Sequence, residues 1–586
     1  MKAAKILLAT VIVALPISLK HFSMIFTYER QSTYRSKNSL LSDPFLQLPT
    51  ESTVNVVWFT DFAGEEHWVE YGTQLQQQIK ATTTKLSNVR EDKDSQIENT
   101  VTKPVARNIW RHEATVKGLK QNQRIPYRVK SKSVEQITAS KIFTLAANPT
   151  SDRSLKILLT SDHQLMPMTT ANLSKVVETI GRLDAVFFPG DLVNVPDRAS
   201  EWFDDRRGGA FFPALQGRGN YELERNGIKT IYRGGEIIQH APLFTAIGNH
   251  EVMGRRTAPT LKEEFNSPIP RKVAANFYRQ VASKINPTED PQIKQNWIKN
   301  NSFNINTYKE IFSLPTNNTD GKYYATTFGN VRLISLYVTN IWRSPSLEAD
   351  EVGRYKESSD NLDDPQQWGY GQHIFEPIKK GSQQYNWLDR ELASKAYQQA
   401  KYKIVMLHHP PHTLGGNIVP PYTEPQQKPN YQNGEMRSLY YDYPIENDYI
   451  IRDLIPLLES AGVQLVYYGH SHLWNRFKSD SGMHFLESSN VGNSYGAHIG
   501  NNSRLIPTYN PENYAAIGNP NGLDPVIPNI DPLIDKTGQP MAYIASNDIT
   551  VFSIFNTKTG TVSSYRYDTR QPGSDAVKFD EFKFDE

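Results

Sequence analysis

The sequence predicts an α/β protein that carries a second, smaller all-β domain at its N-terminal side. Two observations support this. Between residues 53 and 145, short strand-like runs follow one another with turn signals between some of them. From residue 155 onward, near-continuous apolar runs alternate with helix-like stretches, as in proteins with buried parallel strands. With 586 residues, the chain is long enough for two or more domains.

Composition excludes several classes of function. The formal net charge of +2 argues against nucleic-acid binding through a basic surface. The chain has no cysteine, so disulfides, thiolate zinc sites, iron–sulfur clusters and a cysteine nucleophile are all excluded. Any bound metal must therefore be held by His, Asp, Asn, Gln or Glu side chains.

The N-terminus has the pattern of an export signal. Lys2 and Lys5 precede an apolar run over residues 6–19, which is short for a membrane span. We expect residues 1–21 to be a signal peptide or an uncleaved anchor, and the polar residues 22–47 to be a linker. No other run approaches spanning length, so we expect a secreted or periplasmic protein with no membrane span beyond such an anchor.

The first domain is expected over residues 48–148. Residues 53–59 alternate as a strand does, and further strand-like runs follow at 67–71, 111–116, 124–132 and 141–145. Short strands at this spacing predict a small β-sandwich. It contains no cluster of His or Asp, so we expect a structural role for it.

The second domain is expected over residues 152–570, with long polar insertions and a frayed, charged tail at 571–586. Its predicted helices cover 170–183, 383–395 and 446–460. Its predicted strands are 155–160, 185–188, 242–247, 331–337, 403–407, 463–468, 484–487, 549–555 and 561–567.

Five of these strands end in polar motifs. Loops at strand ends are where α/β proteins place functional side chains. The motifs are Ser161-Asp162-His163-Gln164, Gly190-Asp191, Gly248-Asn249-His250-Glu251, His408-His409 and Gly469-His470-Ser471-His472.

Oxygen and nitrogen donors in this mixture suit hard and borderline metal ions. In a strand-end turn, His470 and His472 can point the same way while Ser471 points aside, so one loop could serve two ions. Asp191 is placed to bridge such a pair.

The five motifs, in this order, resemble those of the calcineurin-like metallophosphoesterase superfamily over roughly residues 152–500. The preceding module is similar to the fibronectin-III-like N-terminal domain of purple acid phosphatases, with residues 113–119 and 127–129 matching its closing strands. The helix that contains Trp387 is also similar to one in that family. The resemblance implies a central β-sandwich flanked by helices and a centre of two metal ions.

The resemblance also implies roles for individual residues. Asp162 and His472 would bind the first metal, and Asp191 would bridge to the second. The second metal would be bound by Asn249, His408 and His470. His250 would act as general acid or clamp the substrate phosphate, while His409 would lie behind the ligands.

The sequence departs from its relatives at the first metal. Gln164 stands where most of the superfamily has His and purple acid phosphatases have Gly; its carbonyl can coordinate, although less well than imidazole. Asn194 stands where purple acid phosphatases have the tyrosinate ligand, so we expect an enzyme without the iron–phenolate colour. The two divalent or trivalent ions could be Mn, Fe, Zn or Ca. His163, Asn194, Glu251 and His409 are candidates for supporting or substrate contacts.

The leading hypothesis is a phosphomonoesterase that acts on a small phosphorylated substrate. A metal-activated hydroxide would attack phosphorus, and His250 would protonate the leaving group. Two alternatives remain open: a phosphodiesterase or nucleotidase on the same centre, and a non-catalytic secreted phosphate-binding or adhesion protein. The sequence leaves the oligomeric state open.

Overall fold

The structure is a computed structural model of the chain. It describes residues 40–134, 136–256, 259–316, 319–341, 353–500, 506–508, 511 and 522–585. The expected signal peptide or anchor and most of the expected linker lie outside these residues. Within them, no helix is long and apolar enough to cross a membrane.

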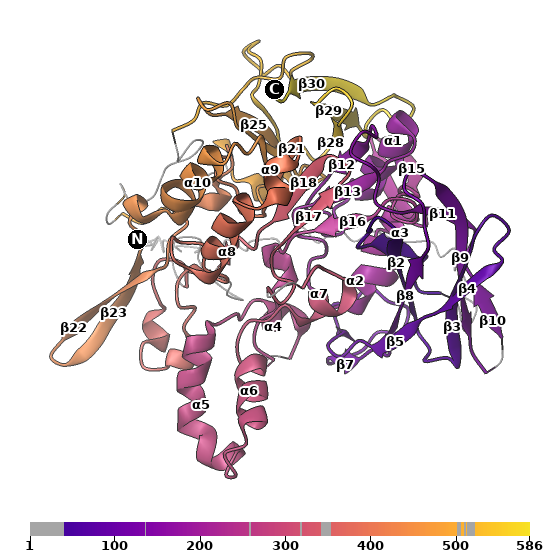
Figure 1. Cartoon of the computed structure of the whole chain (residues 1–586). Helices are drawn as coiled ribbons and strands as arrows, with labels where there is room; N and C mark the ends of the chain where they lie inside the picture. Colours follow the sequence, from indigo (N-terminus) through magenta and orange to yellow (C-terminus); the bar gives the residue numbers. More distant parts are fainter. Residues whose placement is uncertain are drawn as a thin grey trace, which may run out of the picture. The chain divides into compact units, whose positions relative to one another are not determined.

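The N-terminal domain is a sandwich of two antiparallel sheets (Figure 1). Inward side chains of the two sheets, among them Val56, Trp58 and Val129, share one apolar core. The Trp58 indole also donates a hydrogen bond to Ser131 Oγ at 3.0 Å across the sandwich. One sheet has the order β1 (Phe45–Gln47), β2 (Thr53–Thr60), β8 (Trp110–Lys117), β5 (Thr82–Lys85); the other has β10 (Ile137–Ala139), β9 (Arg124–Lys132), β3 (Glu66–Tyr71), β4 (Gln77–Lys80), with β11 (Phe143–Ala146) also on β9.

The expected linker boundary at residue 47 is wrong. β1 is fully buried and pairs with β2, and Leu40 is buried as well. A strand of three residues is too short to show a period in the sequence. Its burial comes from a distant segment, because Phe45 packs against Phe212 with ring centroids 5.0 Å apart.

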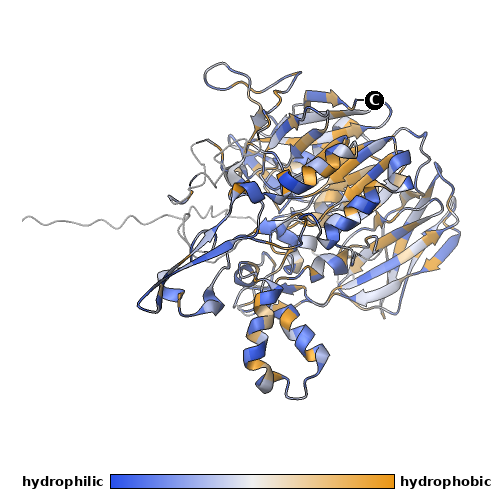
Figure 2. Cartoon of the chain, turned by 60° about the vertical axis from the view of Figure 1, so that its left-hand side comes forward, coloured by the Kyte–Doolittle hydropathy of each residue, from blue (hydrophilic) through white to orange (hydrophobic). Residues whose placement is uncertain are grey.

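Two larger sheets form the second domain and pack face to face. Their facing side chains, such as Leu159, Phe187, Ile404 and Tyr467, belong to one core, and Figure 2 shows apolar residues gathered on these strands. The first sheet has the order β16 (Leu243–Thr245), β13 (Ala185–Phe188), β12 (Lys156–Leu159), β28 (Ile549–Asn556), β29 (Thr561–Asp568), β30 (Val577–Lys583). The second has the order β17 (Tyr324–Phe328), β18 (Val331–Ser335), β21 (Tyr402–Met406), β24 (Leu465–Tyr468), β26 (His484–Ser488), β25 (Trp474–Lys478), β27 (Tyr543–Ile544).

Helices cover the outer faces of both sheets. Leu173 and Val176 of α1 (Thr169–Ile180) pack against the first sheet. The second sheet is covered by α8 (Gln383–Leu392), α9 (Lys395–Gln399) and α10 (Ile455–Ser460). The fold class predicted from the sequence, an α/β domain with a central β-sandwich behind an all-β domain, is confirmed.

The C-terminal residues differ from expectation. The tail is not frayed, because β30 forms the edge of the first sheet and buries Phe579 and Phe582. Asp580, between these aromatics, is also fully buried and pairs with Arg476 at 2.9 Å, which ties this strand to β25 of the second sheet.

The insertions contain further elements. In Figure 1, α5 and α6 form a helical hairpin, and β22 and β23 form a separate ribbon. The elements of the segments between the main strands are α2 (Ala199–Phe203), α3 (Phe211–Leu215), β14 (Tyr221–Arg225), β15 (Ile228–Tyr232), α4 (Leu261–Phe265), α5 (Arg271–Ile285), α6 (Pro291–Asn300), α7 (Asn306–Ile311), β22 (Gln426–Gln432) and β23 (Glu435–Asp442).

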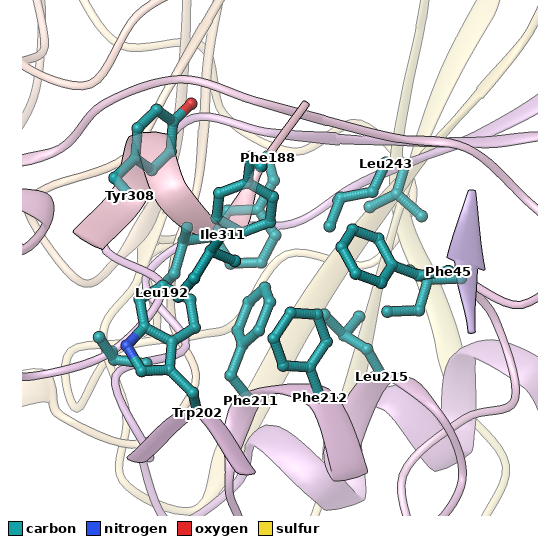
Figure 3. Close-up of a cluster of buried hydrophobic side chains, with 14 of the residues drawn as sticks. Phe45, Phe188, Leu192, Trp202, Phe211, Phe212, Leu215, Leu243, Tyr308 and Ile311 are labelled. Carbon is teal, nitrogen blue, oxygen red and sulfur yellow. The ribbon is translucent and has the colours of Figure 1, made fainter. Parts of the chain in front are cut away.

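An aromatic cluster joins the two domains. In Figure 3, Phe45 of β1 lies beside Phe212 of α3, and the cluster continues through Phe211 of α3 to Trp202 of α2. Phe59 of β2 reaches the same cluster, 5.3 Å from Phe212 between ring centroids. The sandwich therefore shares a core with the segment that follows β13.

Candidate metal centre

The five motif loops meet at one edge of the paired sheets. β16, β13 and β12 run parallel and side by side in the first sheet, and β21 and β24 do so in the second. The carboxyl ends of parallel strands share an edge, so the loops after them converge. Contact across the two sheets is direct, because the His470 backbone N–H donates to Asp162 Oδ1 at 3.0 Å.

The backbone at these loops is strained. Asp162, Asp191, His470 and His472 all have a left-handed φ, between 55° and 83°. This conformation costs a non-glycine residue about 1–2 kcal/mol and is concentrated at functional sites. Neighbouring glycines allow the close approach, since a Cβ on Gly248 would collide with Asp191.

The ionisable side chains fall into two groups that share one residue. Asp191, His408 and His470 form one group, and Asp162, Asp191 and His472 form the other; within each, the potential ligand atoms lie within 4.8 Å of one another. Asp191 is therefore a common member, as expected for a bridging carboxylate.

Asn249 completes the first group. Its Oδ1 lies 3.0 Å from His408 Nε2 and 2.9 Å from His470 Nδ1, while the two ring nitrogens are 3.2 Å apart. His408 Nδ1 lies 3.0 Å from the Pro189 carbonyl oxygen, which fixes Nδ1 as the donor and turns Nε2 towards the centre. These three atoms are lone-pair donors pointing at a common point, and such a set fits a metal cation.

Electrostatics at the centre also favour a cation. Burial raises the pKa of Asp162 to about 7, opposed by His408 and increased further by Asp191. Burial lowers the pKa of His470 well below its ordinary value, so this imidazole is neutral and able to coordinate. Burial also disfavours a charged His408, but the Asp191 carboxylate raises the pKa of His408 to about 9. A proton on His408 thus takes the place that a metal ion would fill beside Asp191.

Gln164 lies at the second group. Its Nε2 donates to Asp191 Oδ2 at 2.9 Å. Its Oε1 is buried and has no hydrogen-bond partner among the described residues. A buried oxygen without a partner, on a side chain that contacts the Asp191 carboxylate, is a potential additional ligand, and it fits the metal site implied by the other donors.

Glu251 orients the loops. Its Oε2 accepts from the backbone N–H groups of Gly248 at 2.7 Å and Asp191 at 2.9 Å, and its Oε1 accepts from Leu192 at 2.8 Å. One buried carboxylate therefore holds the Gly190-Asp191 loop against the loop that begins at Gly248. These contacts suit a supporting role, one of the two for which Glu251 is a candidate.

His250 stands at the accessible side of the centre. Its side chain is 23% exposed, and its Nε2 lies 4.0 Å from Asp191 Oδ2. Nδ1 lies 2.7 Å from the Asn194 carbonyl oxygen, which fixes Nδ1 as the donor and leaves Nε2 facing the centre. The Asn194 side chain does not face the metal donors, because its Nδ2 donates to the Gln164 carbonyl oxygen at 2.6 Å.

His409 lies behind the ligands. It is buried, and its ring packs on those of His470 and Tyr422 with centroids 5.0 Å away in each case. Neither ring nitrogen has a hydrogen-bond partner among the described residues. Burial lowers its pKa to about 3, so the ring is neutral.

His163, a candidate for a supporting or substrate contact, has its side chain in the apolar core. His163 is buried, with its ring edge-on to Phe188 at 4.5 Å between centroids and its Nε2 2.9 Å from Thr160 Oγ1. The left-handed turn at Asp162 directs the neighbouring side chain into the apolar core instead of towards the metal donors.

This placement leads to a prediction for His163→Gln. Burial lowers the pKa of His163 to about 3, against 6.5 in an unfolded chain. Below about pH 6.5 the unfolded chain binds a proton at His163 that the folded chain does not bind, so the free energy of unfolding decreases as the pH falls. Between pH 7.5 and pH 5 this decrease should be about 2 kcal/mol in the wild type, and it should be absent from His163→Gln. Urea unfolding at both pH values measures this; a large loss of activity at neutral pH would contradict the core role.

Sequence reasoning missed Glu487, on β26. Its Oε1 accepts from the Ser471 backbone N–H at 2.7 Å and its Oε2 from Thr413 Oγ1 at 2.8 Å, so it holds the His470–His472 turn. Glu487 occupies an ordinary position in a predicted strand. The only available signal was a carboxylate in a strand otherwise expected to be buried.

Comparison with known proteins agrees with this geometry. The calcineurin-like phosphoesterase family matches residues 155–473, and the purple acid phosphatase N-terminal domain matches residues 42–146. Among solved structures, the chain is similar to purple acid phosphatase PPD1 from yellow lupin (Lupinus luteus) seeds. That match has 14% identity and a TM-score of 0.50, and covers 92% of this chain and 73% of the lupin chain. At this identity it shows the fold alone.

A further match is a bromine derivative of BhCBM56, with 12% identity over 18% of this chain and 91% of that one. Its TM-score of 0.12 is too low to support an argument. No curated protein matches the sequence of the chain.

Proposed function

Because the chain belongs to the calcineurin-like phosphoesterase family, we propose that it is a metal-dependent phosphomonoesterase with a dinuclear centre. The observation that carries this proposal is the sharing of Asp191 between two donor groups. A single ion would need only one such group. Two groups joined by one carboxylate suit two ions acting on one phosphate.

The ligand sets follow from the contacts. Asp162, His472 and Asp191, with Gln164 as an additional oxygen donor, would hold one ion. Asp191, Asn249, His408 and His470 would hold the other. This mixture of oxygen and imidazole donors is compatible with Mn, Fe, Zn or Ca, and Asn194 in place of a phenolate implies a protein without the purple colour. Bound ions would supply Lewis acidity, which activates water and neutralises phosphoryl oxygens.

The chain's own residues then determine the proton transfer. With Nδ1–H donated to the Asn194 carbonyl oxygen, His250 can release a proton only from Nε2. Nε2 is on the side of the centre, within reach of a substrate at Asp191, and the side chain is partly exposed. We assign His250 as the general acid for the leaving alkoxide.

A monoester substrate is supported by the domain combination. The purple acid phosphatase N-terminal domain precedes the phosphoesterase domain here, and the similar lupin structure is named a purple acid phosphatase. We propose an exported protein with a signal or anchor at 1–21, the sandwich domain to residue 148 and the catalytic domain from residue 152. The basis for export is the apolar run after Lys2 and Lys5.

The test is hydrolysis of p-nitrophenyl phosphate and bis(p-nitrophenyl) phosphate by the purified chain, with metal content measured on the same sample. We expect about two ions per chain, at least about tenfold faster hydrolysis of the monoester, and loss of activity with a chelator that added Mn²⁺ reverses. Preference for the diester would support the phosphodiesterase alternative. Bound metal with no turnover of either ester would support a non-catalytic phosphate-binding protein.

A further inference from the structure

Two contacts of the His250 ring come from segments outside the metal-binding motifs. The Asn194 carbonyl oxygen accepts from Nδ1 at 2.7 Å. Phe265, the last residue of α4, packs against the ring with centroids 5.0 Å apart. Whatever fixes Asn194 and Phe265 therefore also fixes the imidazole.

The Asn194 segment is held by a buried carboxylate. Glu201 of α2 accepts from the backbone N–H groups of Asn194 at 2.7 Å and Val195 at 2.9 Å. Its other oxygen accepts from Arg198 Nη1 at 2.8 Å. Arg198 Nη2 in turn donates to Asp92 Oδ1 at 3.1 Å, and Asp92 belongs to the N-terminal domain.

The α4 segment is held by the same stretch of the N-terminal domain. Asp92 Oδ2 accepts from the Leu261 backbone N–H, the first of α4, at 2.7 Å. Glu264, next to Phe265, pairs with Arg90 at 2.6 Å. Arg90 also pairs with Asp197 at 3.0 Å, three residues beyond Asn194.

Burial makes this network rigid. Arg90, Asp92, Arg198, Glu201 and Glu264 are all at most 8% exposed. Buried charges persist only when their partners are in place, so each group in the network has one preferred position. Both contacts of His250 thus converge on residues 90–92, more than 150 positions earlier in the chain.

We propose that the N-terminal sandwich positions the His250 imidazole for proton transfer through its Arg90–Asp92 segment. Asp92, Arg198 and Glu201 are the positioning residues on the Asn194 side, and Arg90 and Glu264 act on the Phe265 side. The sandwich is thereby part of the catalytic apparatus although none of its residues belongs to the metal donor groups. This inference rests on the proposed role of His250.

The test compares Asp92→Asn with a matched control in the full-length protein. The control is Arg111→Lys, which removes a different contact between the domains: Arg111 of β8 donates to the Ile311 carbonyl oxygen at 3.1 Å and to Ser313 Oγ. Two substrates are used, an alkyl phosphate with a poor leaving group and 2,4-dinitrophenyl phosphate, which hardly needs an acid.

For Asp92→Asn we expect kcat to fall about tenfold with the alkyl phosphate and less than about twofold with the dinitrophenyl ester, at unchanged metal content. Arg111→Lys should alter neither rate. Asp92→Asn should add no further loss to His250→Ala, because both changes remove the same interaction. Equal losses with both esters, or additive losses with His250→Ala, would overturn the proposal.

A second measurement does not depend on activity. In protein with ¹⁵N-labelled histidine, the His250 signals, identified by their absence in His250→Ala, report which ring nitrogen holds the proton. We expect a protected Nδ1–H in the wild type and in Arg111→Lys, and its loss of protection in Asp92→Asn. An unchanged signal in Asp92→Asn would overturn the proposal.

If His250→Ala shows no leaving-group dependence, the proton-donor role fails, while the ¹⁵N signal still decides whether Asp92 positions the ring. Should Asp92→Asn fold poorly, Arg198→Lys provides the same test, because it keeps the charge and removes the fork that joins Glu201 to Asp92.

Discussion

Replacing Asp191 by Asn is expected to cause the largest loss of activity of any substitution considered, on the order of a thousandfold or more in kcat. Metal ions supply several kcal/mol of transition-state stabilisation, and about 1.4 kcal/mol corresponds to a factor of ten. Asp191 belongs to both donor groups. An amide has one neutral oxygen, and its NH₂ would point at one of the two sites, so both should lose affinity.

Metal analysis separates this effect from general damage. Asp191→Asn should bind less than about one ion per chain, whereas His472→Ala, which affects one group, should retain about one. Asp43→Asn is the matched control: Asp43 is a mostly buried aspartate beside β1. It should keep both ions and full activity. A variant at Asp191 that retained two ions and more than about a tenth of wild-type activity would contradict the bridging assignment.

The ligands could be predicted from the sequence because of their local setting. Each follows an apolar run, and within one sheet parallel strands bring their carboxyl ends together whatever the intervening length. Asp162 and His470 follow strands of different sheets, so their proximity was implied by the resemblance to the family and not by strand pairing. In the structure, the His470 backbone N–H donates to Asp162 Oδ1 at 3.0 Å.

The supports of the site could not be predicted in the same way. Arg90, in the two-residue strand β6 (Arg90–Glu91), and Asp92, which follows it, have charged partners over 100 residues away. Nothing local distinguishes a buried charge with a distant partner from an exposed one. The packing of His163 against Phe188 could not be predicted either, because neither this contact nor the left-handed φ at the preceding Asp162 is visible in the sequence.

Replacing His250 by Ala is the second large effect expected, and it distinguishes two roles. As a general acid, His250 matters in proportion to the basicity of the leaving group. The kcat for an alkyl phosphate should then fall about a hundredfold or more, and that for 2,4-dinitrophenyl phosphate less than about threefold. As a clamp on the phosphate, it would contribute equally to both substrates. The ratio of the two losses therefore measures the role.

The geometry is compatible with the acid. With Nδ1–H held by the Asn194 carbonyl oxygen, the acid form of His250 is the imidazolium, which gives its Nε2 proton to the leaving group and becomes the neutral ring. The Asn194 carbonyl oxygen occupies Nδ1, so Nε2 is the transferring atom, and its partial exposure lets a proton return from solvent after each turnover. His163→Gln provides a control, because its ring lies in the core. Equal losses for both esters in His250→Ala, with metal content intact, would assign the clamp instead.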